Sequence, residues 1–116
     1  MENELKAEYH KCLNLITKNR SFEILSTGEA FAESEKLIGY YAYFMPHKIT
    51  AEVNYFQKIV KNQEGEISNA QATALAKTSQ EYKDYLLLTG IMKICDEQIR
   101  VLKKFKTDLT NEYQQN

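Results

Sequence analysis

The C-terminal part of the chain restricts the possible folds most, because it contains a long apolar stripe without a proline. From Ser68 onward, apolar residues recur at spacings of three, four or seven, which place them on one face of an α-helix. These residues are Leu75, Tyr82, Leu86, Met92, Cys95, Ile99, Leu102, Leu109 and Tyr113. A helix of about forty residues extends about 60 Å, which exceeds the diameter of a compact domain of this size. We therefore predict one long helix opening near Ser68, part of which projects or pairs with another chain.

Local signals mark the start and the middle of this predicted helix. Residues 68–71, Ser-Asn-Ala-Gln, have the Ser-x-x-Gln form of a capping box. The polar segment 62–66 before it contains Gly65, which is able to adopt a positive φ and so suits a reversal of the chain. Gly90, near the middle of the helix, costs about 1 kcal/mol relative to alanine. At Gly90 we expect either a closely packed neighbouring helix or a bend.

The first half of the chain also has the pattern of helices. The whole chain contains only four glycines and one proline, and this scarcity leaves room for long helices. The apolar spacing predicts a first helix over Asn3–Asn19, and a hydroxyl cap predicts a second helix that opens at Ser26 or Thr27. The mixed segment Ser21–Leu25 is predicted to connect them. Pro46 has no N–H group, so we expect it to end or kink the second helix and to begin another.

These elements predict the fold class and the domain organisation. The expected fold is all-α, an antiparallel bundle of three or four helices with a long C-terminal helix. A hydrophobic content of 43% in 116 residues is enough for one modest core, so we expect a single domain over residues 1–116. The surplus apolar stripe of the long helix predicts self-association, with a dimer as the first expectation.

The overall charge of the chain is nearly balanced and selects no class of partner. There are 15 basic and 16 acidic residues, which is unlike the strong positive field of a dedicated duplex-DNA binder. Cys12 and Cys95 lie among helical apolar residues, where a thiol behaves as a small buried hydrophobe, so no disulfide framework is expected. The first residues are acidic and no apolar run approaches about 20 residues, as a membrane span requires. We predict a cytoplasmic protein without membrane contact.

No arrangement of side chains indicates catalysis or metal binding. His10 and Cys12 are two residues apart on a helix and point to different sides, and no CxxC or HxxxH pair completes a metal site. The chain also lacks the Glu-x-x-His motif of a carboxylate bundle site, a Gly-rich phosphate loop and a GxSxG elbow. We therefore expect no enzyme activity, no cofactor and no metal.

Aromatic residues cluster in the middle of the chain, at Tyr40, Tyr41, Tyr43, Phe44, Tyr55 and Phe56. Consecutive residues of a helix point in all directions, so these side chains cannot all face one core. Aromatic side chains are favoured at the centres of protein contacts, because they bury a large area with little loss of side-chain freedom. We predict that they form a protein interface. The alternative is a central helix that its own bundle surrounds on most sides.

Basic residues cluster near the end of the long helix, at Arg100, Lys103, Lys104 and Lys106. The first three share one helical face by the i, i+3, i+4 rule and could bind phosphates. The alternative, which we favour, is a solvated face stabilised by the helix dipole and by an Asp96–Arg100 pair.

The segment Ala74–Lys104 supplies a resemblance to a known class of proteins. It contains SQEYKDYL at residues 79–86 and IRVLKK at residues 99–104, and it resembles the C-terminal helix of small helical proteins from bacteriophage early regions. The resemblance implies an accessory of DNA replication or recombination, or an inhibitor of a host system.

These observations lead to two functional hypotheses. The first is a non-catalytic helical interaction protein, possessing surplus apolar surface, that self-associates or binds a protein partner. The second is a nucleic-acid-binding accessory protein that uses the basic cluster for phosphates and tyrosines for base stacking.

Overall fold

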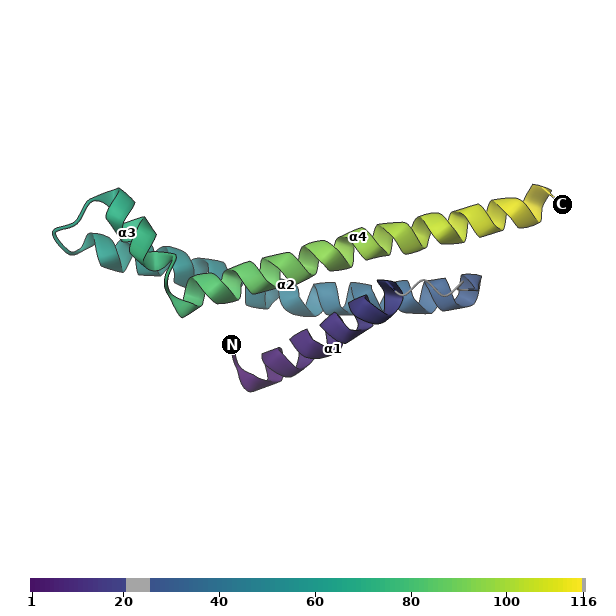
Figure 1. Cartoon of the computed structure of the whole chain (residues 1–116), viewed down its shortest axis with the longest axis horizontal. Coiled ribbons are helices and arrows are strands. Elements are labelled where there is room, and N and C mark those ends of the chain that lie inside the picture. The colour runs from purple at the N-terminus through teal and green to yellow at the C-terminus, as the bar shows by residue number, and fades with distance from the viewer. Residues whose placement is uncertain (21–25, 116) are drawn as a thin grey trace. The chain divides into compact units, whose positions relative to one another are not determined.

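The predicted all-α fold class is confirmed. The computed structural model describes residues 1–20 and 26–115, and among them it contains four helices and no strand. The helices are α1 (Asn3–Arg20), α2 (Thr27–Gln63), α3 (Asn69–Ala76) and α4 (Gln80–Gln115), as Figure 1 shows. The predicted connector Ser21–Leu25 lies outside the described residues.

The chain packs as two compact units, and both long helices contribute to each. The first unit is formed by Met1–Ala42 together with Ile91–Asn116, and the second by Tyr43–Gly90. A single folding domain over residues 1–116 stays a prediction.

In the first unit, α1 packs against α4. The predicted bounds of α1 are correct to within one residue, and its residues Leu5, Cys12 and Ile16 are buried. The Gln98 side chain of α4 donates a hydrogen bond from Nε2 to the Ile16 carbonyl oxygen at 3.0 Å. This bond pairs the half-buried Gln98 amide with the backbone of α1 and connects the two helices.

The second helix begins as the hydroxyl pattern predicts. Ser26 caps α2, since its Oγ accepts a hydrogen bond from the Glu29 backbone N–H at 3.2 Å. The Ala30 N–H bonds to the Ser26 carbonyl oxygen at 2.9 Å and closes the first turn.

Of the expectations at Pro46, the end of this helix and the start of another are wrong, because α2 continues through it; a kink stays a prediction. Pro46 removes one helical hydrogen bond, which in a helix interior costs about 3 kcal/mol. Its ring lies on the exposed side, whereas Phe44 and Ala51 are buried on either side of it in the sequence. Their burial favours the same continuous helix, and the Thr50 hydroxyl donates to the Pro46 carbonyl oxygen at 3.0 Å. Tertiary packing therefore outweighs the local preference for a break.

The end of α2 forms the predicted reversal, but with a different backbone geometry. The N–H groups of Glu64 and Gly65 bond three residues back, to the Lys61 and Asn62 carbonyl oxygens at 3.2 Å. Such bonds tighten the last turn of a helix. The positive φ expected at Gly65 is wrong, since its φ lies outside the left-handed region. The Asn62 side chain then donates to the Ala72 carbonyl oxygen at 3.1 Å, which attaches α3 to the end of α2.

The predicted capping box is confirmed, but it opens a short helix. The Gln71 N–H donates to the Ser68 Oγ at 3.2 Å and the Ser68 N–H donates to the Gln71 Oε1 at 3.1 Å. The helix that it begins, α3, has only eight residues. The prediction of one continuous helix from Ser68 is therefore wrong, and the long helix begins at Gln80.

Two hydroxyl residues cause the break between α3 and α4. The Thr78 Oγ1 donates to the Leu75 carbonyl oxygen at 2.7 Å, and the Ser79 Oγ donates to the Ala76 carbonyl oxygen. The Ser79 Oγ also accepts from the Tyr82 N–H at 3.3 Å, so it caps α4. Side chains of this kind compete with helical backbone bonds and favour caps over helix interiors.

Gly39 of α2 and Gly90 of α4 lie in open space. A Cβ atom built on Gly39 or Gly90 meets nothing within 4 Å. The expectation of a closely packed neighbouring helix at Gly90 is therefore wrong.

Because each of these glycines carries a helical entropy penalty without a packing role, we predict that Gly39→Ala and Gly90→Ala each raise the free energy of unfolding by about 1 kcal/mol. Urea unfolding followed by circular dichroism measures this. The control Gly90→Pro should instead lower stability by about 3 kcal/mol or more. A loss of stability in both alanine variants would contradict the open environment of these positions.

Candidate functional site

The predicted aromatic interface divides into buried and exposed members. Phe44 and Tyr55 are buried, at 0% and 7% exposure, so the prediction that they lie on an interface surface is wrong for them. Tyr40, Tyr41 and Tyr43 are half-buried, and only Phe56 is exposed, at 53%. The alternative of a helix surrounded by its own bundle thus describes one side of α2, and an interface on its other side stays a prediction.

Tyr55 is the centre of an aromatic cluster in the second unit. Its ring centroid lies 4.8 Å from that of Tyr82 and 6.0 Å from that of Tyr85, and the rings of Tyr55 and Tyr85 are within 6° of parallel. Offset aromatic pairs of this kind add about 0.5–1.5 kcal/mol beyond the area they bury. The cluster fixes the first turns of α4 against α2 in this unit.

The half-buried tyrosines also contact groups of their own units. Burial, together with the nearby Glu8 carboxylate of α1, raises the pKa of Tyr40. The Tyr43 ring lies 5.4 Å from that of Phe44 and 5.1 Å from that of His47. These tyrosines are therefore partly engaged in holding the chain's own helices.

An exposed apolar stripe runs along α2 in the second unit. It consists of Ile49, Val53, Phe56 and Val60, which we call the α2 stripe, and each side chain is between 47% and 57% exposed. Their spacings of four, three and four place them on one helical face. The same spacing is visible in the sequence. The spacing alone does not show which apolar residues the chain itself covers, because this depends on α2 continuing through Pro46.

The α2 stripe borders an open hollow on the surface. The hollow has a volume of about 520 Å³, and its lining combines apolar residues of the stripe with polar neighbours: Val53, Phe56, Gln57, Val60, Lys61 and Glu64. All six residues lie on α2 or directly after its end. An apolar lining with a polar border of this kind is typical of sites that bind an apolar surface.

Among the described side chains, large exposed apolar residues are more numerous on α2 than on α4. Within the described side chains of α4, four residues of the predicted stripe are buried: Met92, Cys95, Ile99 and Leu102. Leu86, Leu87 and Val101 are exposed, but their positions do not form a continuous stripe. The side chains of Leu109 and Tyr113 lie outside the described residues.

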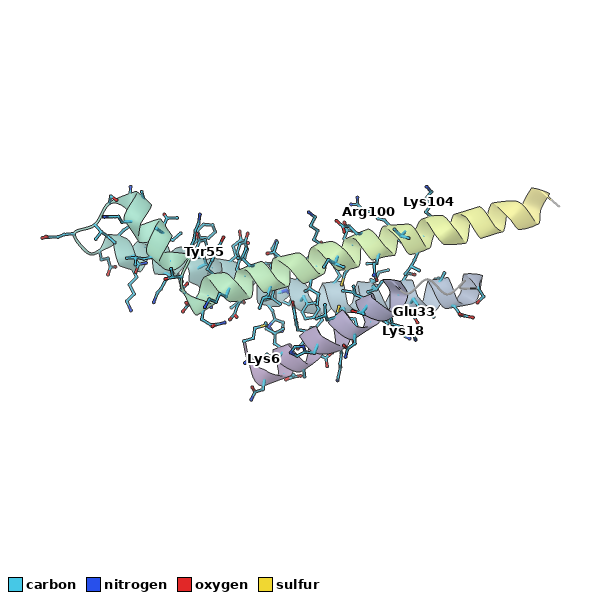
Figure 2. All side chains as sticks on the ribbon, in the orientation of Figure 1. Lys6, Lys18, Glu33, Tyr55, Arg100 and Lys104 are labelled. Atoms are coloured by element: carbon cyan, nitrogen blue, oxygen red, sulfur yellow. The ribbon has the colours of Figure 1, made fainter. Side chains whose placement is uncertain are left out.

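The described members of the basic cluster, Arg100, Lys103 and Lys104, are exposed, as both the phosphate-binding and the solvated-face hypotheses require. The predicted pair is present, with Arg100 Nη2 3.1 Å from Asp96 Oδ2, and the Arg100 side chain is 78% exposed. Lys103 and Lys104 are exposed as well, and Figure 2 shows Arg100 and Lys104 on α4. The side chain of Lys106 lies outside the described residues. An exposed i, i+4 pair contributes about 0.3–0.5 kcal/mol to helix stability.

Neither a cluster of metal ligands nor a membrane-spanning helix occurs among the described residues. It contains no group of three or more His, Cys, Asp or Glu side chains that could hold a metal ion. His10 is exposed and lies edge-on to the Tyr9 ring at 5.7 Å. None of the described helices has the combination of length and apolar content that crossing a membrane requires.

Comparisons with known proteins returned no significant match, since no family model, no curated protein and no solved structure matches the chain. The resemblance to bacteriophage proteins therefore stays a prediction.

Because Tyr55 and Phe56 are adjacent but face opposite environments, we predict very different effects of truncating them. Tyr55→Ala should lower the free energy of unfolding by about 3–5 kcal/mol, and Phe56→Ala by less than about 1 kcal/mol. Urea unfolding at low protein concentration measures both, with Tyr55→Phe as the control that keeps the stacked ring. Equal effects of the two alanine substitutions would contradict this assignment of buried and exposed faces.

Proposed function

We propose that the protein is a non-catalytic interaction protein that forms a homodimer through the α2 stripe. The observation that carries the proposal is the exposure of four large apolar side chains in one continuous row. Exposed apolar rows of this kind, rimmed by polar residues, are typical of protein interaction sites. A second copy of the chain is the occupant that the charges around the stripe favour.

The charges at the two ends of the stripe are complementary under a two-fold axis. Lys48 and Glu64 lie at equal distances along the sequence from Phe56, with Lys48 before it and Glu64 after it. If two copies of α2 pair in antiparallel orientation with Phe56 at the centre, each Lys48 lies opposite a Glu64 of the other copy. A closed dimer requires such a self-complementary surface. Like charges would lie opposite each other in a parallel pair.

The exposed area supports a weak dimer. Full burial of one Val, Ile or Phe side chain contributes about 1.5–3 kcal/mol, and the stripe residues are already about half-buried. Eight half-exposed side chains in the two copies then contribute about 6–12 kcal/mol. The loss of translational and rotational freedom costs at least about 4 kcal/mol, which leaves at most about 2–8 kcal/mol. The middle of this range corresponds to a Kd between about 10 µM and 1 mM.

The proposal places the protein in the cytoplasm. The chain has only two cysteines, whereas small secreted domains are typically dense in disulfides.

The test is sedimentation velocity of the full chain over a range of about 10 µM to 1 mM. The wild-type protein should shift from monomer to dimer as the concentration rises. Phe56→Glu and Val60→Glu should each abolish the shift, because they place a charge in the apolar contact.

The matched control is Asn54→Glu, which makes the same change in charge at an exposed α2 position outside the hollow and should dimerise normally. A wild-type protein that stays monomeric at 1 mM, or dimers that persist in Phe56→Glu, would overturn the proposal. Binding of a single-stranded oligonucleotide at low salt that is lost in Lys104→Glu but not in Phe56→Glu would instead support the nucleic-acid hypothesis.

A further inference from the structure

The two cysteines of the chain meet in the core of the first unit. Cys12 on α1 and Cys95 on α4 are both fully buried, and their Sγ atoms are 3.4 Å apart. They are separated by 83 positions in the sequence, so folding alone brings them together. Neither thiol takes part in the proposed dimer contact, which lies on α2.

The separation of the sulfurs is close to what a disulfide requires. At 3.4 Å the two atoms are in contact, and a disulfide bond of about 2.05 Å requires them to approach by about 1.4 Å. Divided between two side chains, this is a shift that side-chain rotation supplies, although it does require repacking of the neighbours. A merely apolar role for two cysteines does not require their sulfurs to face each other.

The contact makes the two thiols chemically unequal. The hydrogen bond to Cys95, with burial as the second cause, raises the pKa of Cys12 above its usual range. The hydrogen bond between the two thiols lowers the pKa of Cys95 against the opposing effect of burial. Because the thiolate is the nucleophile, Cys95 is the sulfur that reacts first and Cys12 is the one that resolves.

We propose that Cys12 and Cys95 are a redox modification site that a small peroxide converts into a reversible disulfide linking α1 to α4. In the first step, the Cys95 thiolate attacks one peroxide oxygen and the O–O bond breaks. This gives Cys95 sulfenic acid and a hydroxide, which takes up the proton lost by Cys95 and becomes water. In the second step, the Cys12 sulfur attacks the Cys95 sulfur, the S–O bond breaks, and the leaving hydroxide departs with the Cys12 proton as a second water. The two sulfurs lose two electrons in total and the peroxide gains them.

Burial of the thiols selects the class of oxidant. With no exposed surface on either cysteine, a bulky charged disulfide such as oxidised glutathione has no access to the sulfurs without extensive opening of the unit. A small neutral peroxide needs a much smaller opening. The buried sulfenic acid has its resolving thiol in contact, which favours disulfide formation over further oxidation.

The test treats the folded full-length protein with hydrogen peroxide, unfolds it in a thiol-alkylating reagent, and measures its intact mass. We expect a monomeric product about 2 Da lighter with no alkylated thiol, and a non-reducing peptide map that joins the peptides of Cys12 and Cys95. The melting temperature of this product should exceed that of the reduced protein by about 10 °C, and a dithiol reductant should reverse both changes. Oxidised glutathione at equal oxidising equivalents should react far more slowly.

The matched controls are Cys12→Ala and Cys95→Ala, each of which leaves one thiol and should show no loss of 2 Da. Wild-type thiols that stay reduced while free glutathione in the same tube is consumed would overturn the proposal. So would a product containing only sulfinic or sulfonic acids, links between chains, or a disulfide that lowers the melting temperature. These readouts are independent of dimer formation through the α2 stripe.

Discussion

Buried side chains recur one heptad apart along α2, at Ala30, Leu37, Phe44 and Ala51, and Tyr55 follows on the same side. This row contributes to the first unit through its early members and to the second unit through its later ones. Its burial explains why α2 continues through Pro46, whose ring is exposed. It also explains why the opposite face, with the α2 stripe, is left for solvent or a partner.

Features that depend on local chemistry could be predicted from the sequence. The bounds of α1, the Ser26 cap and the Ser68 capping box each follow from residues within one or two helical turns, and each is confirmed. The all-α class follows from the spacing of apolar residues and the scarcity of glycine and proline. These signals require no knowledge of what packs against each helix.

Features that depend on competition between local and tertiary effects were missed. At Pro46, tertiary burial prevails over a local helix breaker. At Thr78 and Ser79 the opposite occurs, because their hydroxyls end α3 in the middle of an apolar pattern that favours one continuous helix. Tyr55 and Phe56 are neighbours of similar character, and only the packing of Tyr82 and Tyr85 decides which of them is buried. The contact of Cys12 with Cys95 is equally beyond a local pattern.

The central claim is that a second copy of α2 covers the stripe in antiparallel orientation about Phe56. Intermolecular distances between spin labels measure this most directly, with a single new cysteine at position 50 or 57 in separate proteins. The native thiols are buried and so are protected from the bulky label. Antiparallel pairing predicts a short distance at position 57 and one longer by roughly 15 Å at position 50, because each residue of displacement along the axis counts 1.5 Å in both copies. Equal distances at the two positions, or no intermolecular coupling at all, would contradict the account.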